Sequence, residues 1–169
     1  MTFHLHRAFS FWFLLIPLML SAATAKAQTK IVRVGTTVLS EDSPKGNASV
    51  TIRTGLFAAK CTCACPAARM LRLLGTKEIE VTEHLEISVD GKSIFVPGEV
   101  SDYLFEAHQG SLRFDSGNFV LRIDGGDASN SYFVLIYFDR SMVDRYVTYS
   151  GEAPDKPLSD THYFEVGVE

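Results

Sequence analysis

Three cysteines at two-residue spacing, Cys61, Cys63 and Cys65, are the only cysteines in the sequence and its most conspicuous chemical feature. In an extended segment this spacing places all three sulfur atoms on one side, with successive cysteine Cα atoms about 6.5 Å apart. Thiolates grouped in this way suit a soft metal ion such as Cu(I) or zinc, or a redox pair. The cluster is therefore a candidate copper or zinc site.

The same cluster has simpler interpretations that involve no metal. Metal carriers usually add histidine or methionine ligands, yet no histidine lies in this segment and Met70 is the one nearby methionine. In an oxidising compartment an odd number of cysteines leaves one thiol free or paired with another chain. We favour a local disulfide in a loop, or cysteines packed as small apolar residues beside the start of a helix, over a metal or redox function.

Aromatic residues are concentrated in two successive predicted strands, 132–138 and 143–149. Most of them should be core, because strands favour aromatic side chains and a small sandwich needs bulky ones. If one face of these strands stays open, however, tyrosines beside arginines would resemble a protein-binding surface. The candidate ligand- or partner-binding residues are Tyr132, Tyr137, Arg140, Arg145 and Tyr149.

Sequence signatures of catalysis are missing from the chain, which has no G-x-S-x-G, H-E-x-x-H, S-x-x-K or P-loop motif. One arrangement resembles part of a triad: Asp160 and His162 would share a face of an extended segment and point toward Ser129 or Ser159. Such spacings are common by chance. The sequence therefore favours a non-catalytic role, with a small hydrolase as the weakest alternative.

A second set of metal-ligating residue types lies near residue 84. Glu80, His84 and Glu86 have the same parity, so they would share one face of an uninterrupted strand. A solvated polar face opposite a buried one explains the same pattern, and we favour that interpretation.

Residues 1–27 are typical of an export signal. A short polar start with Arg7 leads into an apolar run, and Ala25-Lys26-Ala27 gives the A-x-A pattern read by signal peptidases. The run is interrupted by Pro17 and is shorter than the roughly 20 residues that span a bilayer. We expect a cleaved signal peptide, with an uncleaved anchor as the alternative, and a periplasmic or secreted single domain over residues 28–169.

The charge balance narrows the range of partners. The whole chain has a formal charge of −4, and residues 1–27 contribute only basic groups, so the exported part is more acidic still. Such a surface disfavours nucleic acids and anionic membranes, because both are bound largely through clustered cations. No second long apolar run follows the signal, so we expect no membrane span after cleavage.

Hydrophobic periodicity predicts a mainly β fold. Apolar residues alternate with polar ones over 85–89, and Asp90-Gly91 is a strong hairpin turn. A second hairpin is expected around Ser116-Gly117, and helical patterns over about 66–74 and 99–108 predict two short helices. Residues 151–160 contain two prolines and are expected to form a loop. We therefore expect an antiparallel meander, from Leu85 to Tyr149, that forms a small sandwich or partly open barrel.

Together these features favour a non-enzymatic exported binding protein of the cell envelope, of an inhibitor, toxin-neutralising or ligand-binding type. Its partner would be an envelope protein or a small ligand. The alternative from a different class is a thiol-based metal-binding or redox protein that uses the C-x-C-x-C cluster.

Overall fold

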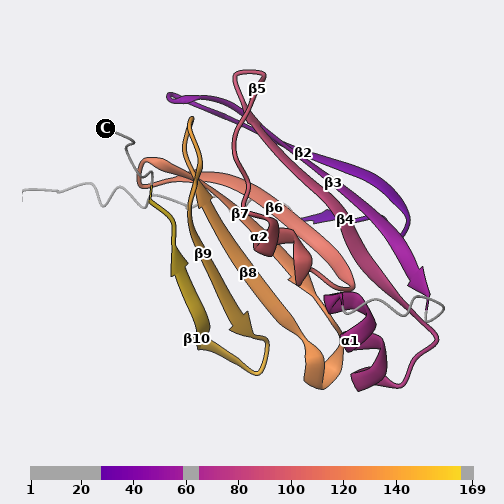
Figure 1. Cartoon of the computed structure of the whole chain (residues 1–169). Coiled ribbons are helices and arrows are strands. Elements are labelled where there is room, and N and C mark those ends of the chain that lie inside the picture. The colour runs from indigo at the N-terminus through magenta and orange to yellow at the C-terminus, as the bar shows by residue number, and fades with distance from the viewer. Residues whose placement is uncertain (1–27, 59–64, 165–169) are drawn as a thin grey trace, which may run out of the picture.

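The computed structural model describes residues 28–58 and 65–164, and within them two antiparallel sheets pack face to face with two helices beside them (Figure 1). The predicted mainly β, sandwich-like fold is thus confirmed. Residues 1–27, predicted as the signal peptide, lie outside the described residues. No helix among the described residues is long and apolar enough to cross a membrane.

The larger, six-stranded sheet has the strand order β1-β6-β7-β8-β9-β10, and the four-stranded sheet has the order β2-β3-β4-β5. The strands of the six-stranded sheet are β1 (Thr29–Lys30), β6 (Ala107–Asp115), β7 (Asn118–Gly125), β8 (Tyr132–Phe138), β9 (Val143–Ser150) and β10 (Ala153–His162). Those of the four-stranded sheet are β2 (Gly35–Ser43), β3 (Gly46–Ala58), β4 (Glu78–Val89) and β5 (Lys92–Ser93). The predicted meander therefore runs through β6 to β9 and on into β10, while β4 pairs with β3 in the other sheet.

Both predicted hairpin turns are present. Asp90 and Gly91 between β4 and β5 have φ angles of 52° and 75°, and Ser116 and Gly117 between β6 and β7 have φ angles of 50° and 98°. Two consecutive positive φ angles define the turn whose twist matches that of paired strands. Local sequence chemistry is sufficient to specify these two turns.

The first predicted helix is confirmed at its expected bounds. Helix α1 (Pro66–Leu74) has proline in its first turn and ends at Gly75, whose φ of 65° is the left-handed conformation common after a helix. Its buried Leu71 packs in a small cluster with Ile79 and Phe105. The helix therefore covers the end of the sandwich where β4 begins.

The second helix is shorter than predicted. Helix α2 (Gly98–Asp102) stops well before residue 108, and Ala107 already begins β6. The backbone between them pairs with β4 instead: Thr82 N–H donates to the Leu104 carbonyl (3.1 Å), and Glu106 N–H donates to the Glu80 carbonyl (3.0 Å). These long-range hydrogen bonds replace the helix that the local pattern predicts. The periodicity of a short segment contains no information about pairing with a distant strand.

The prediction of a loop over residues 151–160 is wrong, because most of these residues belong to β10. This strand pairs with β9 at the edge of the sheet, and its register shifts on both sides of Pro157. Proline is tolerated at such a place because an edge strand leaves one side of its backbone unpaired. The strand is exposed along nearly its whole length, so neither sheet packs over it.

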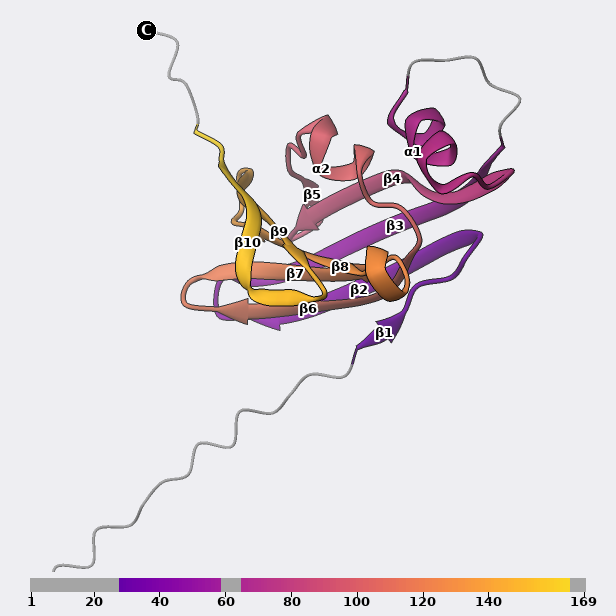
Figure 2. The same ribbon diagram turned by 90° about the horizontal axis from the view of Figure 1, so that it is seen from below.

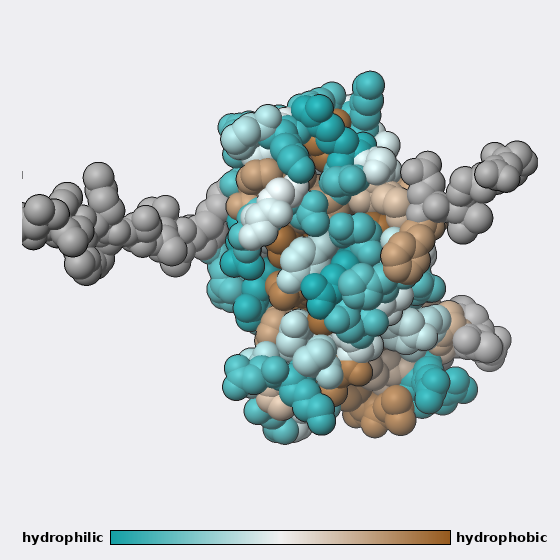
Figure 3. Space-filling view, turned by 90° about the vertical axis from the view of Figure 1, so that its left-hand side faces the viewer, coloured by the Kyte–Doolittle hydropathy of each residue, from teal (hydrophilic) through white to brown (hydrophobic). Residues whose placement is uncertain are grey.

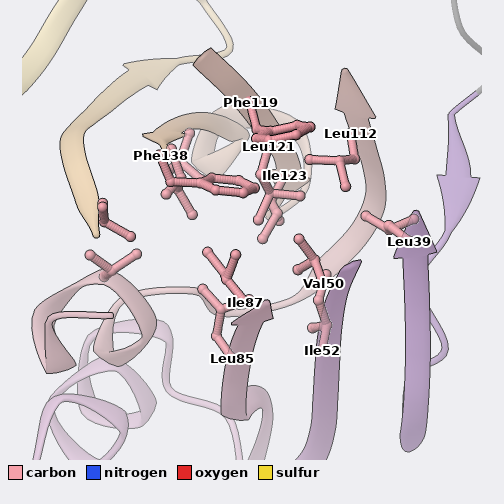
Figure 4. Close-up of a cluster of buried hydrophobic side chains, with 14 of the residues drawn as sticks. Leu39, Val50, Ile52, Leu85, Ile87, Leu112, Phe119, Leu121, Ile123 and Phe138 are labelled. Atoms are coloured by element: carbon pink, nitrogen blue, oxygen red, sulfur yellow. The ribbon is translucent and has the colours of Figure 1, made fainter. Parts of the chain in front are cut away.

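The main core lies between the two sheets (Figure 4). Val50, Ile52 and Ile87 of the four-stranded sheet meet Leu121 and Ile123 of the six-stranded sheet, and all five are fully buried. The rings of Phe119 and Phe138 stack beside them with centroids 5.4 Å apart. Burial of these alternating side chains sets the strand register, since a one-residue slip would turn each of them to solvent.

Helix α2 closes one side of this core. Val100 within it and Leu104 just after it are almost completely buried and belong to the main cluster, together with Tyr146 of β9. Figure 2 shows α1 and α2 on the same side of the molecule, next to β4, with β9 and β10 curving toward α2.

Substitution of Gly126, just after β7, tests whether the connection between β7 and β8 requires a glycine. Its φ is +70°, and an added Cβ would clash with the Asn130 carbonyl oxygen, a backbone atom. We expect Gly126→Ala to lower the free energy of unfolding by at least about 2 kcal/mol, measured by urea denaturation. The matched control is Gly98→Ala, since a Cβ at Gly98 meets nothing within 4 Å. Equal stability of the two variants would contradict this account.

Asp139 stabilises the connection between β8 and β9 in a pH-dependent way. Burial alone would raise the pKa of Asp139, but hydrogen bonds from the Ser141 hydroxyl and N–H (both 2.7 Å) and from Met142 N–H (3.2 Å) outweigh it, so the pKa lies below 3.8. A lowered folded-state pKa means that this stabilisation is complete above about pH 4 and is lost as the pH falls through the folded-state value.

We therefore expect Asp139→Ala to reduce the free energy of unfolding by about 1 kcal/mol at pH 7 and by less near pH 3, in urea denaturation at both pH values. Asp139→Asn is the control, because its amide oxygen still accepts hydrogen bonds while the charge is gone. A destabilisation by Asp139→Ala that does not change with pH would disprove the carboxylate's role.

Candidate functional site

A cavity of about 390 Å³ opens between α2 and the inner side of β8, β9 and β10. This volume is in the range of small-molecule sites. Four of the six tyrosines of the chain line it, and we call it the tyrosine cleft. Its lining residues are Glu99, Tyr103, Tyr132, Val134, Tyr146, Thr148, Ser159, Thr161 and Tyr163.

Strand register explains why these side chains meet. Thr148 of β9 pairs with Val134 of β8 on one side and with Ser159 of β10 on the other, so the three form one row across the sheet. Tyr146 and Thr161 form part of the next row on the same face. Because side chains alternate along a strand, paired residues of this parity all face α2.

Hydrogen bonds hold the tyrosines of the cleft in place. The Tyr132 hydroxyl donates to the Phe105 carbonyl (2.7 Å), and the Tyr163 hydroxyl donates to Glu99 Oε1 (3.0 Å). Burial raises the pKa of Tyr132, of Tyr146 and of Tyr163 above the ordinary tyrosine value of 10. The three phenols are uncharged at neutral pH, and Glu99 is the one acidic or basic side chain among the described residues that line the cleft.

The sequence-predicted binding residues fall on two opposite faces. Tyr132 lines the tyrosine cleft. Tyr137, Arg145 and Tyr149 lie on the other side of the six-stranded sheet, where Tyr137 pairs with Arg145 and Tyr149 pairs with Phe133. The structure does not bring the predicted residues together into one surface.

Arginines and aromatic rings interlock on that outer face. The Arg122 guanidinium lies 4.1 Å from the centre of the Phe133 ring, which stacks on Tyr149 with centroids 4.5 Å apart. The Arg145 guanidinium lies over Tyr137 at 5.3 Å and makes two hydrogen bonds to Asp160, of 2.9 and 2.7 Å. The rings are partly covered by these contacts, so the face is not an open row of tyrosines.

Arg140 connects three hairpin ends. Its Nε donates to the Lys45 carbonyl (2.7 Å), and its guanidinium forms an ion pair with Asp90 (3.0 Å). These contacts join the β8–β9 connection to the β2–β3 and β4–β5 turns. They give Arg140 a structural role, while a role in binding stays a prediction.

Of the cysteine cluster, only Cys65 is described, and Cys61 and Cys63 lie outside the described residues. Cys65 directly precedes α1 and has an interaction partner. Among residues 28–58 and 65–164, no three side chains of histidine, cysteine, aspartate or glutamate are grouped to hold a metal ion. The copper or zinc site therefore stays a prediction that concerns the cluster as a whole.

The other chemical candidates do not converge. Asp160 lies 3.4 Å from His162, but its carboxylate is bound by Arg145 on the outer face, whereas Ser159 points into the tyrosine cleft. The strand that would align Glu80 with His84 has a bulge between them, since Arg53 pairs with His84 while Thr54 pairs with Thr82. A bulge reverses the parity of the residues beyond it, so Glu80 leaves the predicted face, while His84 Nε2 and Glu86 Oε2 still lie 3.8 Å apart on it.

Comparison of the chain with protein-family models, with curated proteins and with solved structures gave no match. The function is therefore argued from the geometry.

Sequence reasoning missed most of the tyrosine cleft. The predicted residues Arg145 and Tyr149 have one parity of β9, whereas the cleft uses Tyr146 and Thr148 of the other parity. Glu99 and Tyr103 come from a helical segment that carries no sequence signal for binding. A search for tyrosines of matching parity on neighbouring strands would have found part of the site.

The hydrogen bond from Tyr132 to the Phe105 carbonyl is the contact that ties the cleft to the β4 side of the fold. We expect Tyr132→Phe to lower the free energy of unfolding by about 1–2 kcal/mol, because it leaves a carbonyl without its donor beside a buried ring. Tyr137→Phe on the outer face is the control and should change stability by less than about 0.5 kcal/mol. Thermal or urea unfolding that ranks the two variants in the opposite order would refute this assignment.

Proposed function

We propose that the protein is an exported, non-enzymatic binding protein that takes a small organic cation in the tyrosine cleft. The observation that carries the proposal is the combination of four tyrosines with Glu99 as the one charged side chain lining the cavity. Aromatic side chains grouped around a carboxylate are the usual means of recognising quaternary ammonium groups.

The electrostatics of the lining favour a cation over an anion. The face of each tyrosine ring carries partial negative charge, which attracts a cation. Burial also raises the pKa of Tyr132 and of Tyr146, so these two phenols stay neutral over a wider pH range. Within residues 28–58 and 65–164, no lysine, arginine or histidine lines the cleft to neutralise an anionic ligand. An anion would thus lose its hydration without gaining a charged partner.

Glu99 remains able to bind a ligand. Tyr163 donates to its Oε1 oxygen, and an ionised carboxylate accepts several hydrogen bonds through two oxygens. The hydroxyls of Thr148, Ser159 and Thr161 supply further donors and acceptors along the β9–β10 side. These groups suit binding and orientation. The described residues of the lining include no cysteine, lysine or histidine to act as an activated nucleophile or as a general base, which favours binding over catalysis.

A periplasmic or secreted location is part of this proposal. It is supported by the signal-like residues 1–27 and by the acidic charge balance of the chain. A small cation from the surroundings of the cell would reach the cleft directly there.

Calorimetric titration with tetramethylammonium and choline tests the proposal. We expect both to bind, and we expect 3,3-dimethylbutan-1-ol, the neutral isostere of choline, to bind at least tenfold more weakly. Glu99→Gln should weaken the binding of both cations about tenfold, since a charge-assisted contact of about 1.4 kcal/mol is lost. Glu152→Gln, at the exposed turn between β9 and β10, is the control and should bind like the wild type.

Two outcomes would overturn the proposal. One is the failure of either cation to bind at millimolar concentration. The other is equal affinity for choline and for its neutral isostere, because the cleft would then recognise shape without charge.

A further inference from the structure

The tyrosine cleft adjoins two further cavities, and Tyr103 lines all three. A cavity of about 170 Å³ shares Tyr103 and Tyr132 with the tyrosine cleft. A third, of about 280 Å³, shares Met70, Tyr103 and Phe105 with the second one and reaches the start of α1. These three adjoining cavities follow one another from β10 to α1, and we call the series the long groove.

The two ends of the long groove differ in polarity. The β9–β10 end offers hydroxyl groups and the Glu99 carboxylate. The α1 end is lined mainly by apolar side chains, which are Pro66, Met70, Leu73, Leu74, Ile79 and Phe105. Leu73 and Tyr103 are 72% and 60% exposed, so a ligand can reach both side chains. A ligand that fits both ends has a polar head and an apolar chain.

Charges along the long groove set the orientation of such a ligand. Glu99 lines the tyrosine cleft, and Glu106 lines the middle cavity next to it. At the far end the charged lining residue is Arg69. A cationic head is attracted to the tyrosine cleft and repelled from the α1 end, whereas an apolar chain gains by covering Leu73 and Phe105.

The floor of the long groove is firmly held. Phe105 is buried and packs with Leu71 and Ile79. Its carbonyl oxygen accepts a hydrogen bond from the Tyr132 hydroxyl. Its backbone also bridges to Val81 of β4. A preformed floor of this kind binds a chain at a lower entropic cost than a floor that must first be ordered.

Figure 3 shows the side of the molecule formed by β9 and β10, where hydrophilic residues cover most of the surface and apolar atoms are visible between them. Leu158 of β10 is an exposed apolar residue, at 68% exposure, that belongs to none of the three cavities. It therefore provides a matched control for Leu73.

We infer that the ligand is a single-chain cationic amphiphile, with its ammonium head in the tyrosine cleft and its alkyl chain over Tyr103 and Phe105 toward α1. This inference rests on the proposed function, because it specifies the class of cation that the same site binds.

Titration with alkyltrimethylammonium ions of one to eight alkyl carbons, below their micelle-forming concentrations, tests the inference. We expect affinity to rise about two- to fourfold for each added methylene until the groove is filled. In the Leu73→Asp variant, the gain in log affinity per added methylene should fall to half of the wild-type gain or less. Tetramethylammonium should bind to this variant as it does to the wild type. Leu158→Asp should keep the full rise, and circular dichroism should confirm that both variants are folded.

The outcomes separate this inference from the proposed function. If tetramethylammonium binds but affinity does not depend on chain length, or depends on it equally in Leu73→Asp, the long groove does not hold the chain and the inference is overturned. The inference is also overturned if Leu158→Asp reduces the dependence of affinity on chain length as much as Leu73→Asp does, because the alkyl chains would then bind to the protein non-specifically. If no ammonium ion binds at all, the proposed function fails and the inference fails with it.

Discussion

Backbone hydrogen bonds between β4 and residues 104–106 determine how the two sheets meet. Thr82 and Glu106 donate the two bonds of this short pairing, and immediately afterwards the chain enters β6 of the other sheet. The pairing ends α2 early, buries Leu104 in the main core and Phe105 in the smaller cluster, and exposes Tyr103 beside them. The middle of the long groove and the closure of the core thus depend on one crossing segment.

Alternation of side chains then gives the two faces of β8 and β9 different environments. On the inner face, Tyr132, Tyr146 and Thr148 line the tyrosine cleft with α2 opposite them. On the outer face, arginine–aromatic contacts and the Arg145–Asp160 pair cover the rings. Tyrosines on the two sides of these strands therefore have different environments. On the inner side, α2 lies opposite the sheet and encloses a cavity with it, whereas on the outer side arginine side chains cover the rings.

Much of the fold could be predicted because its signals are local. The turn residues Asp90-Gly91 and Ser116-Gly117 adopt the positive φ angles that their types allow, and α1 has its proline and glycine at the expected ends. The parts that could not be predicted depend on distant pairing. Helix α2 stops where β4 offers hydrogen bonds, and β10 forms in spite of two prolines because β9 is available beside it.

The sequence by itself determined the fold class, the hairpins, α1 and the aromatic content of the strands that carry the candidate site, since periodicity and turn chemistry are properties of neighbouring residues. Only the tertiary structure decided which tyrosines share a cavity. It grouped Tyr103 and Tyr163 with Tyr132 and Tyr146, separated Tyr137 and Tyr149 from them, and supplied Glu99 as the charge. The physical reason is that a cavity is formed by side chains brought together by strand register and by one crossing segment, and neither is encoded in any short stretch of the chain.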